Sequence, residues 1–96
     1  MLTHIVCWKY KDEVSEEERK DHRAALRNLV GQIPEIIEFR VGKDMMHLER
    51  SFDTGLYSTF ADEEALKRYS DHPAHTAVAA MGRVMSVQIV SVDFVE

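Results

Sequence analysis

The sequence predicts an α+β domain of the ferredoxin-like class, with the element order β-α-β-β-α-α-β. Four short segments have the composition and two-residue period of strands, and three segments between them space their apolar residues as helices do. Two successive halves of this kind predict a four-stranded antiparallel sheet with its helices on one face. A chain of 96 residues has room for one such domain, covering residues 1–96.

The first half of the chain begins with a strand and continues into a capped helix. Residues 2–10 are rich in apolar side chains and predict the first strand. Ser15 and Glu18 have the spacing of a capping box, so a helix is expected from residue 16 to about residue 32. A glycine and a proline end this helix, and residues 35–43 then alternate as a second strand.

The second half contains two strands with two helices between them. Residues 54–60 alternate as the third strand, after a polar and irregular stretch at 42–53 that predicts a mobile loop. Asp62 suits the N-cap of a short helix that ends near Tyr69. A proline at the first helical position opens another helix at residues 73–85, and residues 87–95 form the last strand.

Composition and charge exclude several classes of partner. The net charge is -5 and the basic residues are scattered among acids, which argues against a nucleic-acid or anionic-membrane surface. No apolar run approaches the roughly 20 residues of a membrane span, and the N-terminus lacks the pattern of a signal peptide. The single cysteine, Cys7, cannot form an internal disulfide and is expected to be a small core residue. We therefore expect a cytoplasmic protein.

The first and last strands are apolar on both faces, which predicts a partner for the sheet. In the last strand, Val90, Val92 and Phe94 alternate with a second apolar set. If the helices cover one face of the sheet, the other apolar face needs a different cover. A second copy of the same sheet, related by two-fold symmetry, is the simplest one. We therefore expect a homodimer.

The candidate site is centred on Tyr69, His72 and His75, which lie on both sides of a proline. A proline at the first helical position places His72 at the N-cap and His75 near the end of the first turn. A helix N-terminus disfavours a proton on imidazole, so His75 is expected to be neutral near pH 7 and able to act as a base. Tyr69 is then placed to donate a hydrogen bond to a substrate carbonyl. Enolisation with aldol-type ring closure, or a lyase or isomerase step, would use this pair.

The pocket around this pair is expected to be mostly apolar. His4, Val6 and Trp8 share one face of the first strand, so His4 is expected to extend the polar end of an apolar pocket. His72 completes the predicted pocket. The expected ligand is a small, mostly apolar carbonyl compound.

Each candidate has a plainer alternative. Tyr69 and His75 could form a structural hydrogen bond that ties helix to sheet, and His4 could be a satisfied core histidine. His72 precedes a proline and suits a helix cap better than an acid or a base. His22 lies at the edge of the apolar stripe of the first helix and is interpreted as a boundary residue. The histidines lack the spacing of a metal motif, so neither a metal nor another cofactor is expected.

Several short motifs along the chain resemble those of one known family. They are His4-Ile5-Val6, Ser15-Glu16-Glu17-Glu18, Ile33-Pro34, Val41-Gly42-Lys43, His72-Pro73-Ala74-His75 and Val92-Asp93-Phe94. Over almost its full length the chain resembles the stress-responsive A/B-barrel family, a branch of the dimeric α/β-barrel superfamily. The resemblance implies a homodimer whose two sheets close a barrel. It also implies a small pocket between sheet and helices in each subunit.

The resemblance further implies roles for individual residues. In a plant polyketide-cyclase member of the family, the catalytic pair is the tyrosine and the second histidine of the motif, which correspond to Tyr69 and His75. A first-strand histidine of its pocket corresponds to His4. The cyclase has an aromatic residue where this chain has Leu26 and a histidine where it has Thr54, so a different substrate is expected.

Two classes of function therefore compete. One is a small pocket enzyme that performs acid–base chemistry on a carbonyl compound, and the other is a non-catalytic stress-response or interaction dimer. A cofactor-free monooxygenase of the wider superfamily is a third, less favoured option. An enclosed cavity with Tyr69 and His75 facing into it favours the enzyme, and a filled interior favours the structural role.

Overall fold

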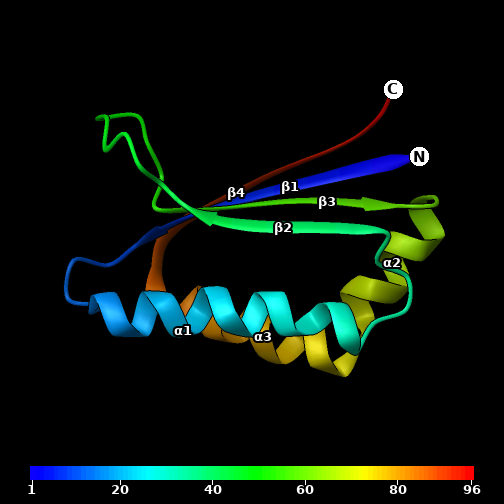
Figure 1. Cartoon of the computed structure of the whole chain (residues 1–96), viewed down its shortest axis with the longest axis horizontal. Coiled ribbons are helices and arrows are strands. Elements are labelled where there is room, and N and C mark those ends of the chain that lie inside the picture. Colours follow the sequence, from blue (N-terminus) through cyan, green and yellow to red (C-terminus); the bar gives the residue numbers. More distant parts are fainter.

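The computed structural model describes residues 1–96 and contains one four-stranded antiparallel sheet with helices packed on one face (Figure 1). The strands lie in the order β2-β3-β1-β4, which confirms the ferredoxin-like class. The elements in chain order are β1 Leu2–Tyr10, α1 Glu16–Arg27, a 3-10 turn Asn28–Gly31, β2 Glu38–Lys43, β3 Thr54–Phe60, α2 Glu63–Asp71, α3 Pro73–Met85 and β4 Ser86–Val95.

Helix α1 begins with the capping box that the sequence predicts. The hydroxyl of Ser15 accepts a hydrogen bond from the Glu18 N–H at 3.1 Å, and the Glu18 carboxylate accepts one from the Ser15 N–H at 3.0 Å. The α-helix ends at Arg27 and tightens into the 3-10 turn, so the predicted helical span was right in extent but not in type. Strand β2 starts three residues later than predicted, because the chain turns after Pro34 before it extends.

The capping box makes a direct test of the helix start. Replacing Ser15 by Ala removes the side-chain acceptor and is expected to lower the free energy of unfolding by about 1 kcal/mol. Ser15→Thr keeps a hydroxyl at the cap and should retain most of that stability. Urea unfolding of the variants at equal protein concentration measures the effect. Equal stability of Ser15→Ala and the parent protein would contradict the assignment.

The core lies between the sheet and the helices. Strand β1 alternates, with every second side chain facing the helices, and β3 does the same beside it. The helices contribute the facing apolar residues. The buried apolar core consists of Leu2, Val6, Trp8, Tyr10, Leu26, Leu29, Ile33, Leu56, Phe60, Ala65, Tyr69 and Met85.

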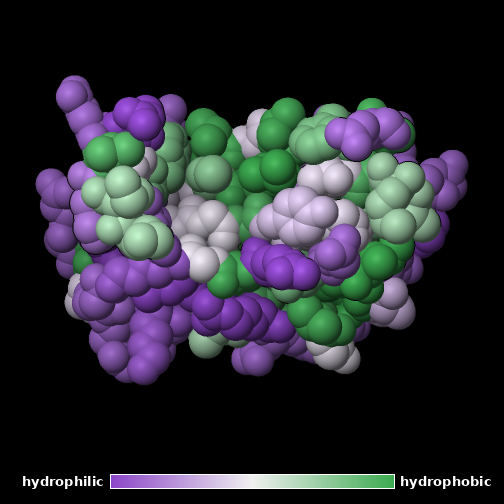
Figure 2. All heavy atoms as spheres, turned by 45° about the horizontal axis from the view of Figure 1, so that its top comes forward, coloured by the Kyte–Doolittle hydropathy of each residue, from purple (hydrophilic) through white to green (hydrophobic).

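The other face of the sheet carries no helix and remains apolar. Ile5 pairs with Val92 and Cys7 pairs with Val90 across β1 and β4, so these side chains share that face. Figure 2, turned so that the helix-free side comes forward, shows hydrophobic residues gathered on it. Val92 is 51% exposed. This apolar, uncovered surface is the feature from which the sequence predicted a second sheet.

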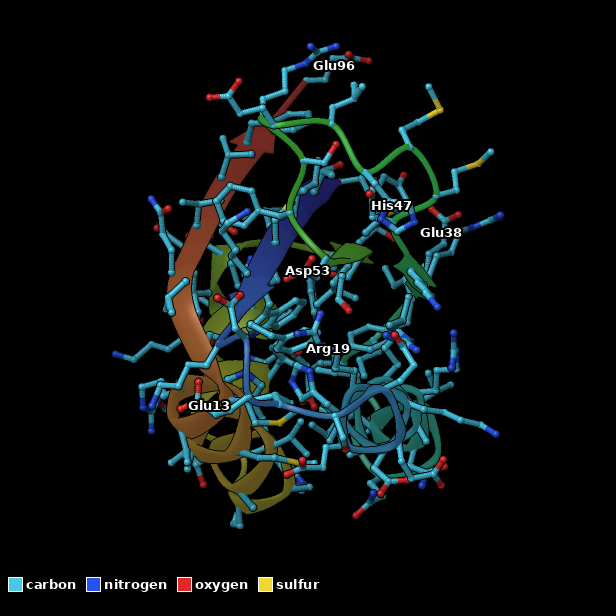
Figure 3. The ribbon with its side chains drawn as sticks, turned by 90° about the vertical axis from the view of Figure 1, so that its left-hand side faces the viewer. Glu13, Arg19, Glu38, His47, Asp53 and Glu96 are labelled. Carbon is cyan, nitrogen blue, oxygen red and sulfur yellow. The ribbon has the colours of Figure 1, made fainter.

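A loop of residues 44–53 projects beyond the sheet at the end where β1 runs into α1 (Figures 1 and 3). Its base is tied down. The Asp53 carboxylate accepts from the Tyr10 N–H at 2.8 Å and lies 3.8 Å from the Arg19 guanidinium. His47 lies out on this loop, with a largely exposed side chain. None of the helices is long and apolar enough to span a membrane.

Candidate functional site

A cavity of about 220 Å³ lies between the helix-facing side of β1 and β4 and the inner face of α3. Most of its wall is apolar, and its polar groups gather at two places. The lining residues are His4, Val6, Trp8, Leu26, Leu56, Tyr69, Ser70, His75, Val78, Ala79, Arg83, Ile89 and Ser91. The structure therefore brings five of the six predicted site residues, from three different elements, to one cavity.

His75 occupies the third position of α3, because Pro73 opens the helix as predicted. Its Nδ1 lies 2.9 Å from the Ser70 carbonyl oxygen. A carbonyl only accepts hydrogen bonds, so Nδ1 carries the proton and donates it. In the neutral ring Nε2 is then the unprotonated nitrogen, which is the form a general base requires.

The pKa of His75 lies below its ordinary value, which agrees with the prediction of a neutral ring. The main cause is burial, which disfavours the charged form. The neighbouring Arg83 guanidinium and His4 lower the pKa of His75 further, and the hydrogen bond to Ser70 opposes them. The prediction gave the right direction from a different cause, since it relied on the field at the helix N-terminus.

Tyr69 ends the buried face of α2 and is almost fully buried. Its ring lies against that of His75 with the centroids 4.5 Å apart, and against Phe60 at 4.8 Å. Burial raises the pKa of its hydroxyl above the ordinary value, so the O–H proton is retained at neutral pH. No side chain or carbonyl of the chain forms a hydrogen bond with this hydroxyl. The structural bond from helix to sheet, considered as an alternative for this residue, is therefore not formed.

His4 is held by an acidic residue of the neighbouring strand. Strands β1 and β4 pair with His4 opposite Asp93, and the His4 Nδ1 is hydrogen-bonded to the Asp93 carboxylate. The carboxylate only accepts, so Nδ1 bears the proton and Nε2 is left for the cavity. The His4 ring lies 6.2 Å from that of Tyr69, centroid to centroid. Asp93 thus fixes the orientation of a third polar group near the pair.

His72 is the predicted pocket residue that the structure places elsewhere. Its Nδ1 accepts a hydrogen bond from the Ala74 N–H at 3.0 Å, which makes it the N-cap of α3. That bond directs the ring toward the helix end, so its inclusion in the pocket is corrected, and the alternative of a helix cap is confirmed. No group of three or more His, Cys, Asp or Glu side chains in the structure is arranged to hold a metal ion.

His22 was interpreted as a boundary residue, and this was wrong. It is fully buried, with Nδ1 2.6 Å from the Tyr10 hydroxyl, which in turn donates to the Thr54 hydroxyl at 2.8 Å. Its Nε2 is buried without a hydrogen-bond partner. Burial, with a smaller contribution from the positive charge of Arg23, lowers the pKa of His22 to about 4. A Cβ at Gly82 would lie only 3.1 Å from this Nε2, so α3 approaches the ring closely.

Two residues near the reacting groups were missed by sequence reasoning. Asp93 could have been found from the strand register, because an antiparallel pairing of the first and last strands can set it opposite His4. Arg83 lies eight residues after His75, about 80° further around the helix, so both residues can belong to one broad helix face. The spacing alone carried no signal, because it does not show which face lines a cavity.

Comparison with known proteins agrees with this geometry. The sequence model of the stress responsive A/B barrel domain family matches residues 2–96 of this chain. An uncharacterized protein of Streptomyces coelicolor is 30% identical, over 95% of this chain and 96% of its own length. Olivetolic acid cyclase of Cannabis sativa is 27% identical, over 97% of this chain and 94% of its own length.

Similar solved structures extend the comparison to the assembly. A dimeric ferredoxin-like protein of unknown function from Thermobifida fusca superposes with a TM-score of 0.90 at 26% identity, covering 99% of this chain and 90% of that one. Two further ferredoxin-like structures of unknown function are also described as dimeric. The family match spans residues 2–96 and agrees with the ferredoxin-like fold of the similar solved structures. This chain belongs to the stress responsive A/B barrel domain family.

Proposed function

We propose that this protein is a homodimeric enzyme that removes a proton from the carbon next to a carbonyl group. The observation that carries the proposal is the apolar cavity in which His75, Tyr69 and His4 meet, with the His75 proton held on Nδ1 by the Ser70 carbonyl. A purely structural protein would be expected to fill its interior with side chains, whereas this chain leaves a cavity with these three polar groups in its wall. The cavity therefore favours the enzyme over the non-catalytic dimer.

The reaction follows from the protonation states. Nε2 of His75 takes the proton from the α-carbon, and the electron pair of the broken C–H bond moves into the carbonyl, whose oxygen becomes negative. The Tyr69 hydroxyl, which keeps its proton, donates a hydrogen bond to that oxygen and stabilises the enolate. His4, oriented by Asp93, is the second proton donor or acceptor at the same end of the cavity.

The enolate then has two outcomes. It attacks the carbon of a second carbonyl of the same molecule, so that a C–C bond closes the ring and the new alkoxide takes the proton back from His75. Alternatively, the proton returns from His75 to a different carbon. The name of olivetolic acid cyclase, which is 27% identical over most of this chain, supports the first outcome. The apolar walls of the cavity, among them Val6, Leu26 and Val78, suit the hydrocarbon part of such a substrate.

Exchange of α-protons with solvent tests the proposal without knowledge of the natural substrate. Small aryl ketones such as acetophenone and para-acetylbenzoate are incubated with the protein in deuterated water, and deuterium at the acetyl carbon is followed by NMR. The wild-type protein is expected to accelerate the exchange above the buffer rate. If bound ketones exchange no faster than in buffer, the acid–base function fails.

Tyr69→Phe separates a catalytic tyrosine from a structural one. Since no group of the chain is hydrogen-bonded to the Tyr69 hydroxyl, removing it should leave the thermal unfolding temperature nearly unchanged. The exchange rate should fall, because the enolate oxygen loses its donor. A variant that melts well below the parent and exchanges at the parent rate would contradict the assigned role.

We also propose that the helix-free face of the sheet is the dimer interface. It carries Val90, Val92 and Phe94 in the open, and the similar solved structures named above are dimeric. Val92→Asp would place an unpaired charge in this interface and should shift the mass measured by light scattering from about two chains to one.

Val84 offers a matched control for the dimer test. It is an exposed valine on α3, outside the helix-free face, so Val84→Asp should remain dimeric. A wild-type protein that stays monomeric at high concentration would refute the proposed interface. So would dimers of Val92→Asp that are as stable as those of the parent.

A further inference from the structure

Arg83 is the only lining residue of the cavity whose side chain carries a permanent charge. No carboxylate of the chain lies within ion-pair distance of its guanidinium, and no hydrogen bond within the chain occupies it. Arg19, Arg23 and Arg68 differ in this respect, since each of them faces a carboxylate. Arg83 is exposed to solvent where it lines the cavity, so its unpaired guanidinium remains available to an anionic group of a bound ligand.

We propose that the cavity takes a carbonyl compound that carries a carboxylate, and that Arg83 binds this carboxylate while the carbonyl lies at the His75 end. The inference rests on the proposed function for the reacting end of the molecule. It adds the chemical class of the substrate and the residue that selects it.

The geometry of α3 places the two ends of such a ligand. His75, Ala79 and Arg83 are four residues apart in turn and all three line the cavity. Two turns and a little more separate His75 from Arg83, a rise of roughly 12 Å along the axis. Side chains on a helix lean toward its N-terminus, so we expect the Arg83 side chain to extend toward His75 past the small side chain of Ala79. The ligand therefore needs a spacer between its carbonyl and its acid.

The surroundings of Arg83 favour a carboxylate over a phosphate. One planar guanidinium matches the two oxygens of a carboxylate, whereas no lysine or second arginine in the lining is available for a phosphate dianion. The positive end of α3 lies at His75 and not at Arg83, so the helix adds no further anion site there. Arg83 also suits the last turn of α3 for the helix dipole alone, but that role does not require a place in the cavity wall.

A pair of probes with one shape and different charge tests the inference. Para-acetylbenzoate carries the carboxylate across a rigid apolar ring from its ketone, and para-acetylbenzamide replaces only the acid. Titration calorimetry on the wild-type protein should show the acid binding at least about tenfold more tightly than the amide, as a charge-assisted contact provides. Arg83→Gln should abolish this preference and leave amide binding unchanged.

Two further variants control for charge. Arg50 is exposed on the 44–53 loop, outside the cavity lining, so Arg50→Gln makes the same change in net charge and should keep the preference for the acid. Arg83→Lys keeps the positive charge but lacks the planar guanidinium, so this variant should retain only part of the preference for the acid.

The result that overturns the inference is distinct from failure of the proposed function. Equal binding of acid and amide, a preference unchanged in Arg83→Gln, or no binding of either compound at millimolar concentration removes the Arg83 site. Preferred binding of the acid without α-proton exchange keeps the site and rejects the reaction. Exchange without any preference for the acid keeps the reaction and rejects the site.

Discussion

Replacing His75 is expected to lower α-proton exchange by about a hundredfold to ten-thousandfold, the usual contribution of a positioned general base. The Ser70 carbonyl holds the His75 proton on Nδ1 and leaves Nε2 free to act as the base. His4 also lines the cavity, but its bond to Asp93 holds it on the sheet, so we expect it to replace His75 as the base only poorly. Deuterium incorporation followed by NMR measures the loss.

The choice of substitution matters, since His75→Ala also removes the bond to Ser70. His75→Asn places an amide N–H near the position of Nδ1 and can keep that bond while supplying no base. Both variants should lose exchange, and the asparagine variant should lose less thermal stability. The control is His47→Asn, because His47 is exposed on the 44–53 loop and takes no part in the cavity. Full exchange in His75→Asn would eliminate His75 as the base.

The pH dependence of the exchange follows from the same residue. Because burial holds the pKa of His75 below its ordinary value, the base form persists to lower pH than it would for a solvated histidine. The decline of the exchange rate on acidification should therefore begin at a lower pH than a solvated histidine would give, and a pH series of the NMR exchange measurement tests this.

Local chemistry decided which parts of the fold could be predicted. The bounds of β3 could be predicted because its residues alternate in polarity and are flanked by a polar loop and an aspartate cap. The start of α3 could be predicted from one proline. The change from α-helix to 3-10 turn after Arg27 left no such mark, because both forms tolerate the same residues. The start of β2 was misplaced because Ile36 and Ile37 have strand-like side chains although the preceding proline turns the chain.

The same distinction applies to the site. His4, Tyr69 and His75 could be predicted to converge, since strand alternation and a helix start fix the direction of each side chain. The position of Asp93 opposite His4 could not be predicted, because it depends on the register between the first and last strands, which no local pattern encodes. His22 was misjudged because its partners, Tyr10 and Thr54, reach it only after the sheet has formed. A polar residue at the edge of the apolar stripe of a helix is interpreted as a boundary residue when its partners are not known.

Burial of His22 predicts a large loss of stability in mild acid. Its pKa is about 4 in the folded protein and about 6.5 when unfolded, so between these values the unfolded chain binds more protons. Stability therefore rises with pH across this window, is complete above about pH 6.5, and falls as the pH drops toward 4. A shift of two to three units corresponds to about 3 kcal/mol, with a slope near 1.4 kcal/mol per pH unit in the middle of the window.

Urea unfolding at fixed protein concentration between about pH 6.5 and 5 measures this slope above the range in which carboxylates titrate. His22→Asn can keep a hydrogen bond to Tyr10 and has no group that titrates, so its slope should be much smaller although its absolute stability is lower. A smaller slope persists in the variant, because burial also lowers the pKa of His75. His47→Asn removes an exposed histidine and should leave the slope of the parent unchanged. If His22→Asn and the parent lose stability in parallel over this window, the buried histidine is not the group responsible.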